Sequence, residues 1–243
     1  MQKFLISEES VDLKTIVITD QDAKHIYKVL RLKSGDQIPL TNGKGLDYEG
    51  VILSATSDTI QVRLTQSRPS TTESPLRLTV CCGMLKDKKM DMVIKHLTQL
   101  GIVEWIPFFC DRSIPTPDSK RLSSRTQRWE TIIKESVKQC QRSCLVSIIG
   151  PKPFLEVLDL SDNFNQKIAF WEKSSLPLTQ LSATPSDNKA IILIGPEGGF
   201  TNTEISLAQE KGFKAYSLGP RILRAETAAI CATTLIQHHL GDI

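Results

Sequence analysis

The chain has 243 residues, 40% of them hydrophobic and 23% charged, with a formal net charge of +3. This length suits one large domain or a small domain and a medium one, and the composition is that of an ordinary globular protein. The apolar runs, such as 190–194, are too short to span a bilayer, and residues 1–9 lack the apolar core of a signal peptide. We therefore expect a cytoplasmic protein with no membrane segment. A charge of +3 does not by itself indicate nucleic-acid binding, so local basic patches must carry that argument.

The six cysteines do not have the spacing of a metal finger. Cys140 and Cys144 lie one helical turn apart, which resembles a metal site only weakly. We interpret the cysteines as reduced, small apolar side chains and expect no metal.

Residues 1–68 predict short strands joined by turns. We expect strands over 15–19, 38–41, 48–53 and 59–64, and one short helix over 23–32. Asn42-Gly43-Lys44-Gly45 lies between two of these strands and is typical of a hairpin. The segment predicts a small β-barrel, followed by a linker over 66–75 that is rich in serine, threonine and proline.

After the linker, strands alternate with helices. We expect strands over 76–82, 103–109, 167–171, 190–194 and 215–218, and helices over 86–100, 123–142, 202–211 and 226–240, with a short helical piece over 176–181. This alternation predicts an α/β domain with a mostly parallel sheet and helices on both faces. Ligands of such sheets bind beyond the carboxyl ends of the strands.

The expected strand 190–194 ends in a turn with three glycines, Ile194-Gly195-Pro196-Glu197-Gly198-Gly199-Phe200. Glycine permits positive φ and the close approach of a ligand, and Thr201 to Glu204 fits a capping box that starts a helix. The turn lacks the motifs of a P-loop and of a dinucleotide site. Its acid favours a cationic or hydroxyl-bearing ligand, such as S-adenosylmethionine. On shape alone, a tight turn without a ligand is an equal alternative.

A second glycine turn follows the expected strand 215–218 and reads Leu218-Gly219-Pro220-Arg221-Ile222-Leu223-Arg224. Arginines at a helix N-terminus oppose the helix dipole, so we expect Arg221 and Arg224 to serve an anionic ligand or Glu226. The helix after them is apolar on nearly every face. We therefore expect it to be buried all round, in the core or against a partner chain.

The two turns, the second extended through Ala225-Glu226-Thr227-Ala228, closely resemble the signature segments of the bacterial 16S rRNA uracil-N3 methyltransferases, the RsmE type of the SPOUT class. The resemblance extends over the whole chain through five further segments: His25 with Val29-Leu30-Arg31, Lys95-x5-Gly101, Arg112-Ser113, Arg128-Trp129 and Gln139-Cys140-x-Arg142. The chain departs from the family pattern at Gln99, Lys138 and Lys3, which puts the roles of those positions in doubt.

The resemblance implies a fold, a cofactor and a substrate. The expected fold is a PUA-like, RNA-binding β-barrel over 1–68 and a SPOUT methyltransferase domain over 76–243, with a trefoil knot within about 167–243. The implied reaction is S-adenosylmethionine-dependent methylation of N3 of one uridine in 16S rRNA, within the small ribosomal subunit. A homodimer is implied as well, in agreement with the apolar last helix.

The expected chemistry centres on the second turn. We predict that Arg224 or Arg221 stabilises the negative charge that develops on a uracil oxygen. Glu197 and Glu226 are both candidates for the proton acceptor, and Glu226 is also a candidate for orienting Arg224 by an ion pair. The expected cofactor-binding residues are Glu172, Ile194, Gly195, Glu197, Gly198, Leu218, Gly219, Ile222 and Leu223.

RNA contacts are predicted from helical spacing. Lys134, Lys138 and Arg142 recur every four residues on one helix face, and Lys88 and Lys95 share a face of the helix 86–100. Two basic stripes suit a phosphate backbone, whereas a solvated helix face is the alternative for any single lysine. The predicted RNA-binding residues are Arg31, Lys88, Lys95, Arg112, Lys134 and Arg142.

Two other functions remain open at this point. One is a SPOUT enzyme that acts on another RNA, such as a tRNA ribose 2′-O-methyltransferase, and the barrel and the segment 221–227 argue against it. The other is a non-catalytic RNA-binding assembly factor, against which the intact glycine turns and both arginines argue.

Overall fold

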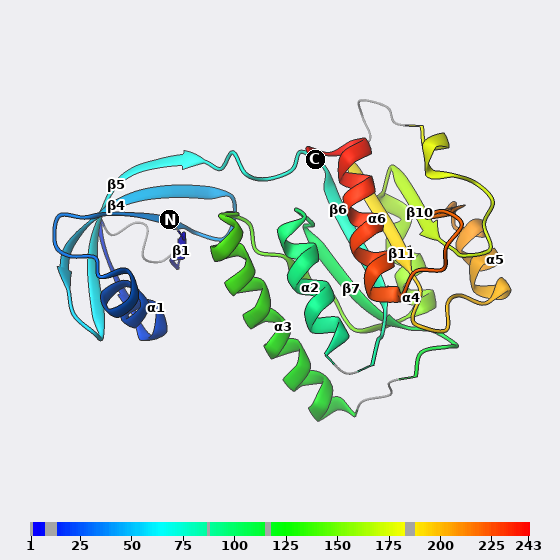
Figure 1. Ribbon diagram of the computed structural model, residues 1–243, viewed down its shortest axis with the longest axis horizontal. Helices are drawn as coiled ribbons and strands as arrows, with labels where there is room; N and C mark the ends of the chain where they lie inside the picture. The colour runs from blue at the N-terminus through cyan, green and yellow to red at the C-terminus, as the bar shows by residue number, and fades with distance from the viewer. Residues whose placement is uncertain (1, 8–13, 87, 115–117, 183–187) are drawn as a thin grey trace. The chain divides into compact units, whose positions relative to one another are not determined.

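The computed structural model describes residues 2–7, 14–86, 88–114, 118–182 and 188–243 (Figure 1). The chain forms two compact units. The first unit comprises Met1–Glu73 and Val137–Leu145, and the second comprises Ser74–Ser136 and Val146–Ile243. The division thus comes later than the predicted residue 68, and the first unit includes a second, distant segment that was not expected there.

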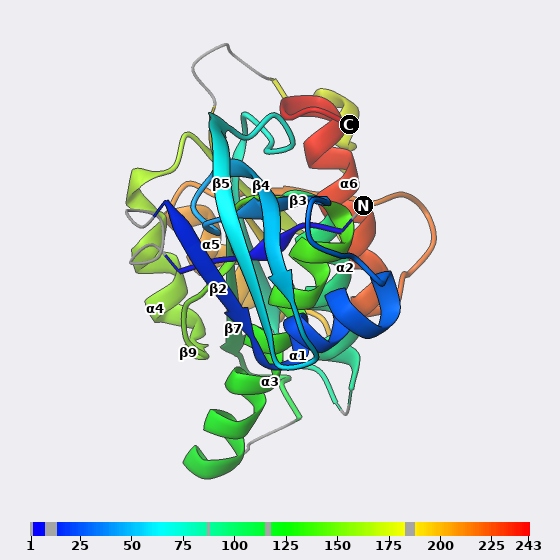
Figure 2. The ribbon, with the colours of Figure 1, turned by 90° about the vertical axis from the view of Figure 1, so that its left-hand side faces the viewer.

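The first unit contains a five-stranded sheet in the order β1-β3-β4-β5-β2. Its strands are β1 (Phe4–Leu5), β2 (Thr15–Thr19), β3 (Gln37–Thr41), β4 (Leu46–Ala55) and β5 (Thr59–Pro69). Figure 2 shows β2, β5 and β4 side by side, and their pairing is antiparallel. The predicted hairpin is confirmed, because Asn42 Oδ1 accepts hydrogen bonds from the backbone of Lys44 and Leu46. Strand β5 continues to Pro69, so the start of the predicted linker belongs to a strand.

The helix predicted over 23–32 is present but differs in type. It begins as α1 (Asp20–Lys24) and continues as a π-helix, η2 (His25–Leu30), that ends at Arg31 with a φ of 56°. Ala23 and Ile26 are buried against the sheet, so the apolar face of the segment sets its position.

The second unit contains a parallel sheet in the order β12-β10-β11-β6-β7-β8, with β9 also paired to β7. Its strands are β6 (Arg77–Gly83), β7 (Glu104–Phe109), β8 (Ser147–Ile148), β9 (Lys152–Pro153), β10 (Gln166–Phe170), β11 (Lys189–Ile194) and β12 (Lys214–Tyr216). The predicted parallel α/β arrangement is confirmed. The two-residue strands β8 and β9 were not predicted.

Helices cover both faces of this sheet. They are α2 (Lys89–Gln99), α3 (Ser119–Cys140), α4 (Phe154–Asp159), η3 (Leu160–Asn163), η4 (Leu178–Gln180), α5 (Asn202–Glu210) and α6 (Ala225–Leu240). Helices α4 and α5 pack on a core that includes Phe108, Ile191 and Leu193, whereas α2 and α6 pack together, with α6 against β11 (Figure 1). Alternate residues of the buried strands therefore serve different helix layers.

Helix α6 is buried on one side only within the single chain. Ala229, Ala232 and Ile236 are buried, but Ile230 and Leu235 are half-buried, so the expectation of burial on every face is not met by this chain alone. The buried Gln237 fixes the end of the helix, because it accepts a hydrogen bond from Ser74 and donates one to the Leu100 carbonyl. Among the described residues, no helix is long and apolar enough to cross a membrane.

Candidate functional site

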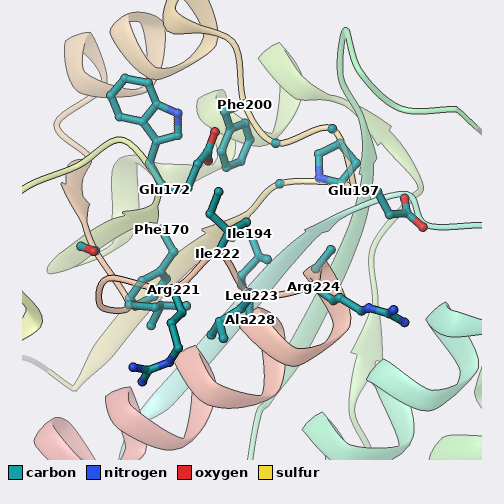
Figure 3. Close-up of a pocket in the computed structure, with 18 of the residues that line it drawn as sticks. Phe170, Glu172, Ile194, Glu197, Phe200, Arg221, Ile222, Leu223, Arg224 and Ala228 are labelled. Atoms are coloured by element: carbon teal, nitrogen blue, oxygen red, sulfur yellow. The ribbon is translucent and has the colours of Figure 1, made fainter.

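A pocket of about 520 Å³ lies at the carboxyl ends of β10, β11 and β12 (Figure 3). Both glycine turns form its walls, together with Phe170, Trp171 and Glu172 at the end of β10 and the first turn of α6. Its volume lies within the range of small-molecule sites. The structure thus brings the two turns together, at the edge of the sheet where the sequence placed a ligand.

The first turn is tightly packed, which explains its glycines. A Cβ at Gly198 would lie 2.8 Å from the Cβ of Arg112, and Gly199 has a φ of +68°. A Cβ at Gly83, where β6 ends, would lie 2.5 Å from the backbone nitrogen of Pro196. The predicted capping box is confirmed, because Thr201 Oγ1 accepts from the Glu204 backbone and Glu204 accepts from the Thr201 backbone. The strand therefore leads into α5 by a rigid corner.

The second turn is more open. Gly219 has a φ of +109°, and a Cβ added to it would meet no atom within 4 Å. The side chain of Ser217 holds the turn, because its Oγ accepts from the Gly219 backbone at 3.1 Å. Ile222 lines the pocket with 84% of its surface exposed. Ser217 belongs to no recognisable sequence motif, because its role depends on this local hydrogen bond.

The two arginines of the second turn are exposed and point in different directions. In Figure 3, Arg224 points to the same side of the pocket as Glu197, whereas Arg221 points to the opposite side. Both residues line the pocket. The structure therefore does not support a joint action of both guanidinium groups on one ligand atom.

Lys89, the first residue of α2, joins the two predicted proton acceptors. Its Nζ lies 3.1 Å from Oε1 of Glu197 and 3.5 Å from Oε2 of Glu226. One expectation was an ion pair between Glu226 and Arg224. In the structure, Glu226 pairs with Lys89 instead. It is 7% exposed and does not line the pocket, whereas Lys89 and Glu197 do. Lys89 was not predicted as a site residue, because its position in the sequence does not distinguish it from its neighbour Lys88.

The Lys89–Glu197 pair is ionised at neutral pH. The hydrogen bond to Glu197 raises the pKa of Lys89 above its usual value, against the opposing effect of desolvation. Burial alone raises the pKa of Glu197, but hydrogen bonds from Lys89 and from backbone amides outweigh it, so this pKa lies below its usual value. A carboxylate stabilised in this way is a weak base.

The remaining walls fit a ligand with a flat apolar part and hydroxyl or cationic groups. Phe170, Ile194, Leu223 and Ala228 supply apolar surface, and Glu172 supplies a second carboxylate. The indole N–H of Trp171 is buried and finds no hydrogen-bond acceptor among the residues that the structure describes. These side chains suit adenine, ribose hydroxyls and a sulfonium, so the pocket fits S-adenosylmethionine.

Of the six predicted RNA-binding residues, five are exposed and one, Arg142, is buried. Arg31, Lys88, Lys95 and Lys134 are exposed, as the prediction requires. Arg112 is exposed too, but its Nη1 donates a hydrogen bond of 2.9 Å to the Gly198 carbonyl. It is therefore attached to the first glycine turn.

For Arg142 the prediction is wrong. Its side chain is only 3% exposed, and its Nε and Nη2 donate to Oε2 of Glu73 at 3.1 and 2.7 Å. Lys138, on the same predicted stripe, is 7% exposed and pairs with Asp22 at 2.8 Å. Both cations belong to the segment Val137–Leu145 of the first unit, where they form ion pairs with acids. They are therefore not available to a phosphate.

Two family models match the chain, an RNA methyltransferase domain over residues 72–237 and an RNA methyltransferase PUA domain over residues 18–65. The ribosomal RNA small subunit methyltransferase E of Rickettsia conorii is 30% identical over 236 residues, which cover 96% of this chain and 93% of that protein. The chain belongs to this methyltransferase family. The predicted family and enzyme class, a methyltransferase of small-subunit rRNA, are thereby confirmed.

Two solved structures of similar proteins have the same fold as this chain, and both contain S-adenosylmethionine. A family member from Neisseria gonorrhoeae, bound to S-adenosylmethionine, has a TM-score of 0.89 at 28% identity and covers 100% of this chain and 99% of its own. A methyltransferase from Legionella pneumophila, also in complex with S-adenosylmethionine, has a TM-score of 0.89 at 26% identity with the same coverage. The predicted cofactor, S-adenosylmethionine, agrees with both.

Proposed function

We propose that this member of the ribosomal RNA small subunit methyltransferase E family transfers the methyl group of S-adenosylmethionine to N3 of one uridine in 16S rRNA. The observation that carries the proposal is the pocket of about 520 Å³ that both glycine turns form at the strand ends. Relatives with bound cofactor support the choice of methyl donor.

The cofactor would be held by residues of both turns and of the β10 end. Phe170, Ile194 and Leu223 offer apolar surface to the adenine, and Glu172 offers a carboxylate to the ribose hydroxyls. The remaining predicted contacts lie on the same walls: Gly195, Glu197, Gly198, Leu218, Gly219 and Ile222. Bound S-adenosylmethionine supplies a methyl group for in-line displacement at its sulfonium, so positioning is the main task of these residues.

Arg224 is our candidate for stabilising the uracil oxygen anion. Loss of the N3 proton places negative charge on the uracil oxygens, and a fixed guanidinium favours that charge. Arg224 shares its side of the pocket with Glu197, whereas Arg221 points away (Figure 3). We assign Arg221 to binding of the RNA backbone instead, because a guanidinium can form paired hydrogen bonds with a phosphate.

We infer that the N3 proton leaves to solvent. Glu226 does not line the pocket, and Glu197 is a weak base because its pKa is lowered, chiefly by hydrogen bonds that outweigh burial. Arginine is protonated at neutral pH and cannot accept the proton. The target base must first leave its stack or be unpaired, which brings water to N3 as well.

RNA binding and assembly extend the proposal beyond the pocket. We propose that the first unit, through Arg31, and the exposed Lys88, Lys95, Lys134 and Arg112 contact 16S rRNA within the small ribosomal subunit, which predicts a cytoplasmic enzyme. We also propose a homodimer through the half-buried face of α6. We further propose a trefoil knot within about 167–243, which the family resemblance implies.

Arg224→Ala tests the function. We expect methylation of 16S rRNA to fall by about 100-fold or more, because one charge-stabilising donor is lost, while calorimetry shows unchanged binding of S-adenosylmethionine. Mass spectrometry of the methylated nucleoside identifies the product. A ribose-methylated product or a tRNA substrate contradicts the proposed function, whereas full turnover by the variant contradicts the role assigned to Arg224. An inactive wild type that still binds rRNA favours an assembly factor.

A further inference from the structure

Lys89 lies between two acids that come from different parts of the chain. Glu197 belongs to the first glycine turn, and Glu226 belongs to the first turn of α6, directly after the second glycine turn. Oε1 of Glu197 also accepts a hydrogen bond from the Lys86 backbone at 3.2 Å. The Lys86 backbone and the Lys89 side chain thus hold the first glycine turn by two donors, and Lys89 also holds α6 by its charge.

The burial of Glu226 makes this cation important. Oε2 of Glu226 is buried and has no hydrogen-bond partner within the described ranges, and Lys89 is the cation that faces it at 3.5 Å. A buried carboxylate is costly unless a counter-ion lies close to it. Without the Lys89 ammonium, Glu226 and Glu197 would lose their common counter-ion. The repulsion between the two carboxylates would then push the first glycine turn and the start of α6 apart.

We propose that Lys89 is a positioning residue, whose ammonium holds the first glycine turn and the start of α6 at the separation that the cofactor requires. The inference rests on the proposed function, since it concerns the same pocket. Lys89 needs no contact with the reacting atoms for this role. It acts through Glu197, which lines the pocket, and through Glu226, which lies in the first turn of α6 directly after the second glycine turn.

The test is the affinity for S-adenosylmethionine, measured by calorimetry without RNA so that phosphate contacts do not contribute. We expect Lys89→Met to weaken binding by about tenfold or more, as loss of one partner leaves a buried charge unpaired. Lys89→Arg keeps the charge, and we expect it to bind within about threefold of the wild type. Lys211→Met is the matched control, because Lys211 also pairs with an acid, Asp159 at 2.7 Å, but does not line the pocket.

A rescue experiment separates positioning from a general loss of stability. Adding Glu226→Gln to Lys89→Met removes the unpaired charge, so we expect the double variant to regain most of the lost affinity. The Glu226→Gln single variant completes the cycle. Melting temperatures of the cofactor-free variants show how much of each change belongs to folding. If Lys89→Met does not fold, Lys89→Gln, which keeps a hydrogen-bond donor, is measured in the same way.

Two results overturn the inference. One is wild-type affinity in the uncharged Lys89 variant, and the other is a double variant that binds no better than that variant. A wild type that binds no S-adenosylmethionine contradicts the proposed function instead. If the first of these results comes with weaker RNA binding, Lys89 is assigned to the RNA surface instead.

Discussion

At the scale of single residues, charges decide which predictions could succeed. Periodicity places Lys134, Lys138 and Arg142 on one helix face, but it does not show that two of them meet acids far away in sequence. Lys3, which departs from the family pattern, likewise pairs with Asp47 at 2.8 Å and donates to Ser143. Such pairings depend on the tertiary fold. The turns themselves are visible in the sequence, because Gly199 and Gly219 adopt a positive φ that favours glycine, whereas the packing of Gly198 against Arg112 is not.

The ion pair at the pocket predicts how cofactor binding depends on pH. Because the pKa of Glu197 is lowered, the stabilisation by its ion pair with Lys89 is fully present above the usual pKa of 4.5. This stabilisation is lost as the pH falls through the lowered pKa. Because the pKa of Lys89 is raised, the stabilisation by the same ion pair is fully present below the usual pKa of 10.5. It is lost only as the pH rises through the raised pKa. Between these limits both groups stay charged.

We therefore expect the affinity for S-adenosylmethionine to be constant within about twofold from roughly pH 6 to 7.5, below the range in which the ligand's own amine titrates. Calorimetry at several pH values in one ionic strength checks this. Methylation should instead rise with pH over the same range, because hydroxide removes the N3 proton. A methylation rate that stays constant over this range would contradict this, because a carboxylate base of the enzyme is ionised throughout it.

At the scale of elements, long periodic segments were predictable and short ones were not. The buried run of β11 and the capping box of α5 each carry a local pattern that is sufficient to place them. Helix α4 has six residues and the strands β8 and β9 have two each, too few for a period to be recognised. The π-helical form of η2 also has no counterpart in the side-chain pattern.

The end of α3 gives a prediction at this scale. Glu73 accepts hydrogen bonds from the backbone of Ser143 and Cys144 and from Arg142, so it anchors the chain that leaves the helix. We expect Arg142→Ala to lower the free energy of unfolding by about 3 kcal/mol, because it leaves this acid without its charge partner. Urea unfolding followed by circular dichroism measures the change.

Arg121→Ala is the control for Arg142, since Arg121 pairs with Asp118 at 3.6 Å on the exposed surface. An exposed pair of this kind contributes about 0–1 kcal/mol. Equal stability of the two variants, with weaker RNA binding by Arg142→Ala, would restore Arg142 as an RNA contact.

At the scale of the whole molecule, the sequence predicts the two kinds of structure but not how the chain is divided between them. The return of Val137–Leu145 to the first unit depends on buried contacts such as Thr41 Oγ1 to the Ser143 carbonyl at 3.2 Å. These contacts join residues about a hundred positions apart, and no local pattern encodes them. A knot is equally invisible to periodicity, so the resemblance alone suggested it.

The proposed homodimer gives the last prediction. Within the single chain, α6 leaves Leu235 half-buried beside the half-buried Cys231, so an apolar strip remains to be covered. Leu235→Lys places a charge on this strip, and burying an unpaired charge in an interface is costly. We expect the wild type to sediment at twice the chain mass and Leu235→Lys to sediment as a monomer. Leu155→Lys on α4, where the apolar side chain is 59% exposed, should leave the mass unchanged. A Leu235→Lys protein that stays dimeric would place the interface elsewhere.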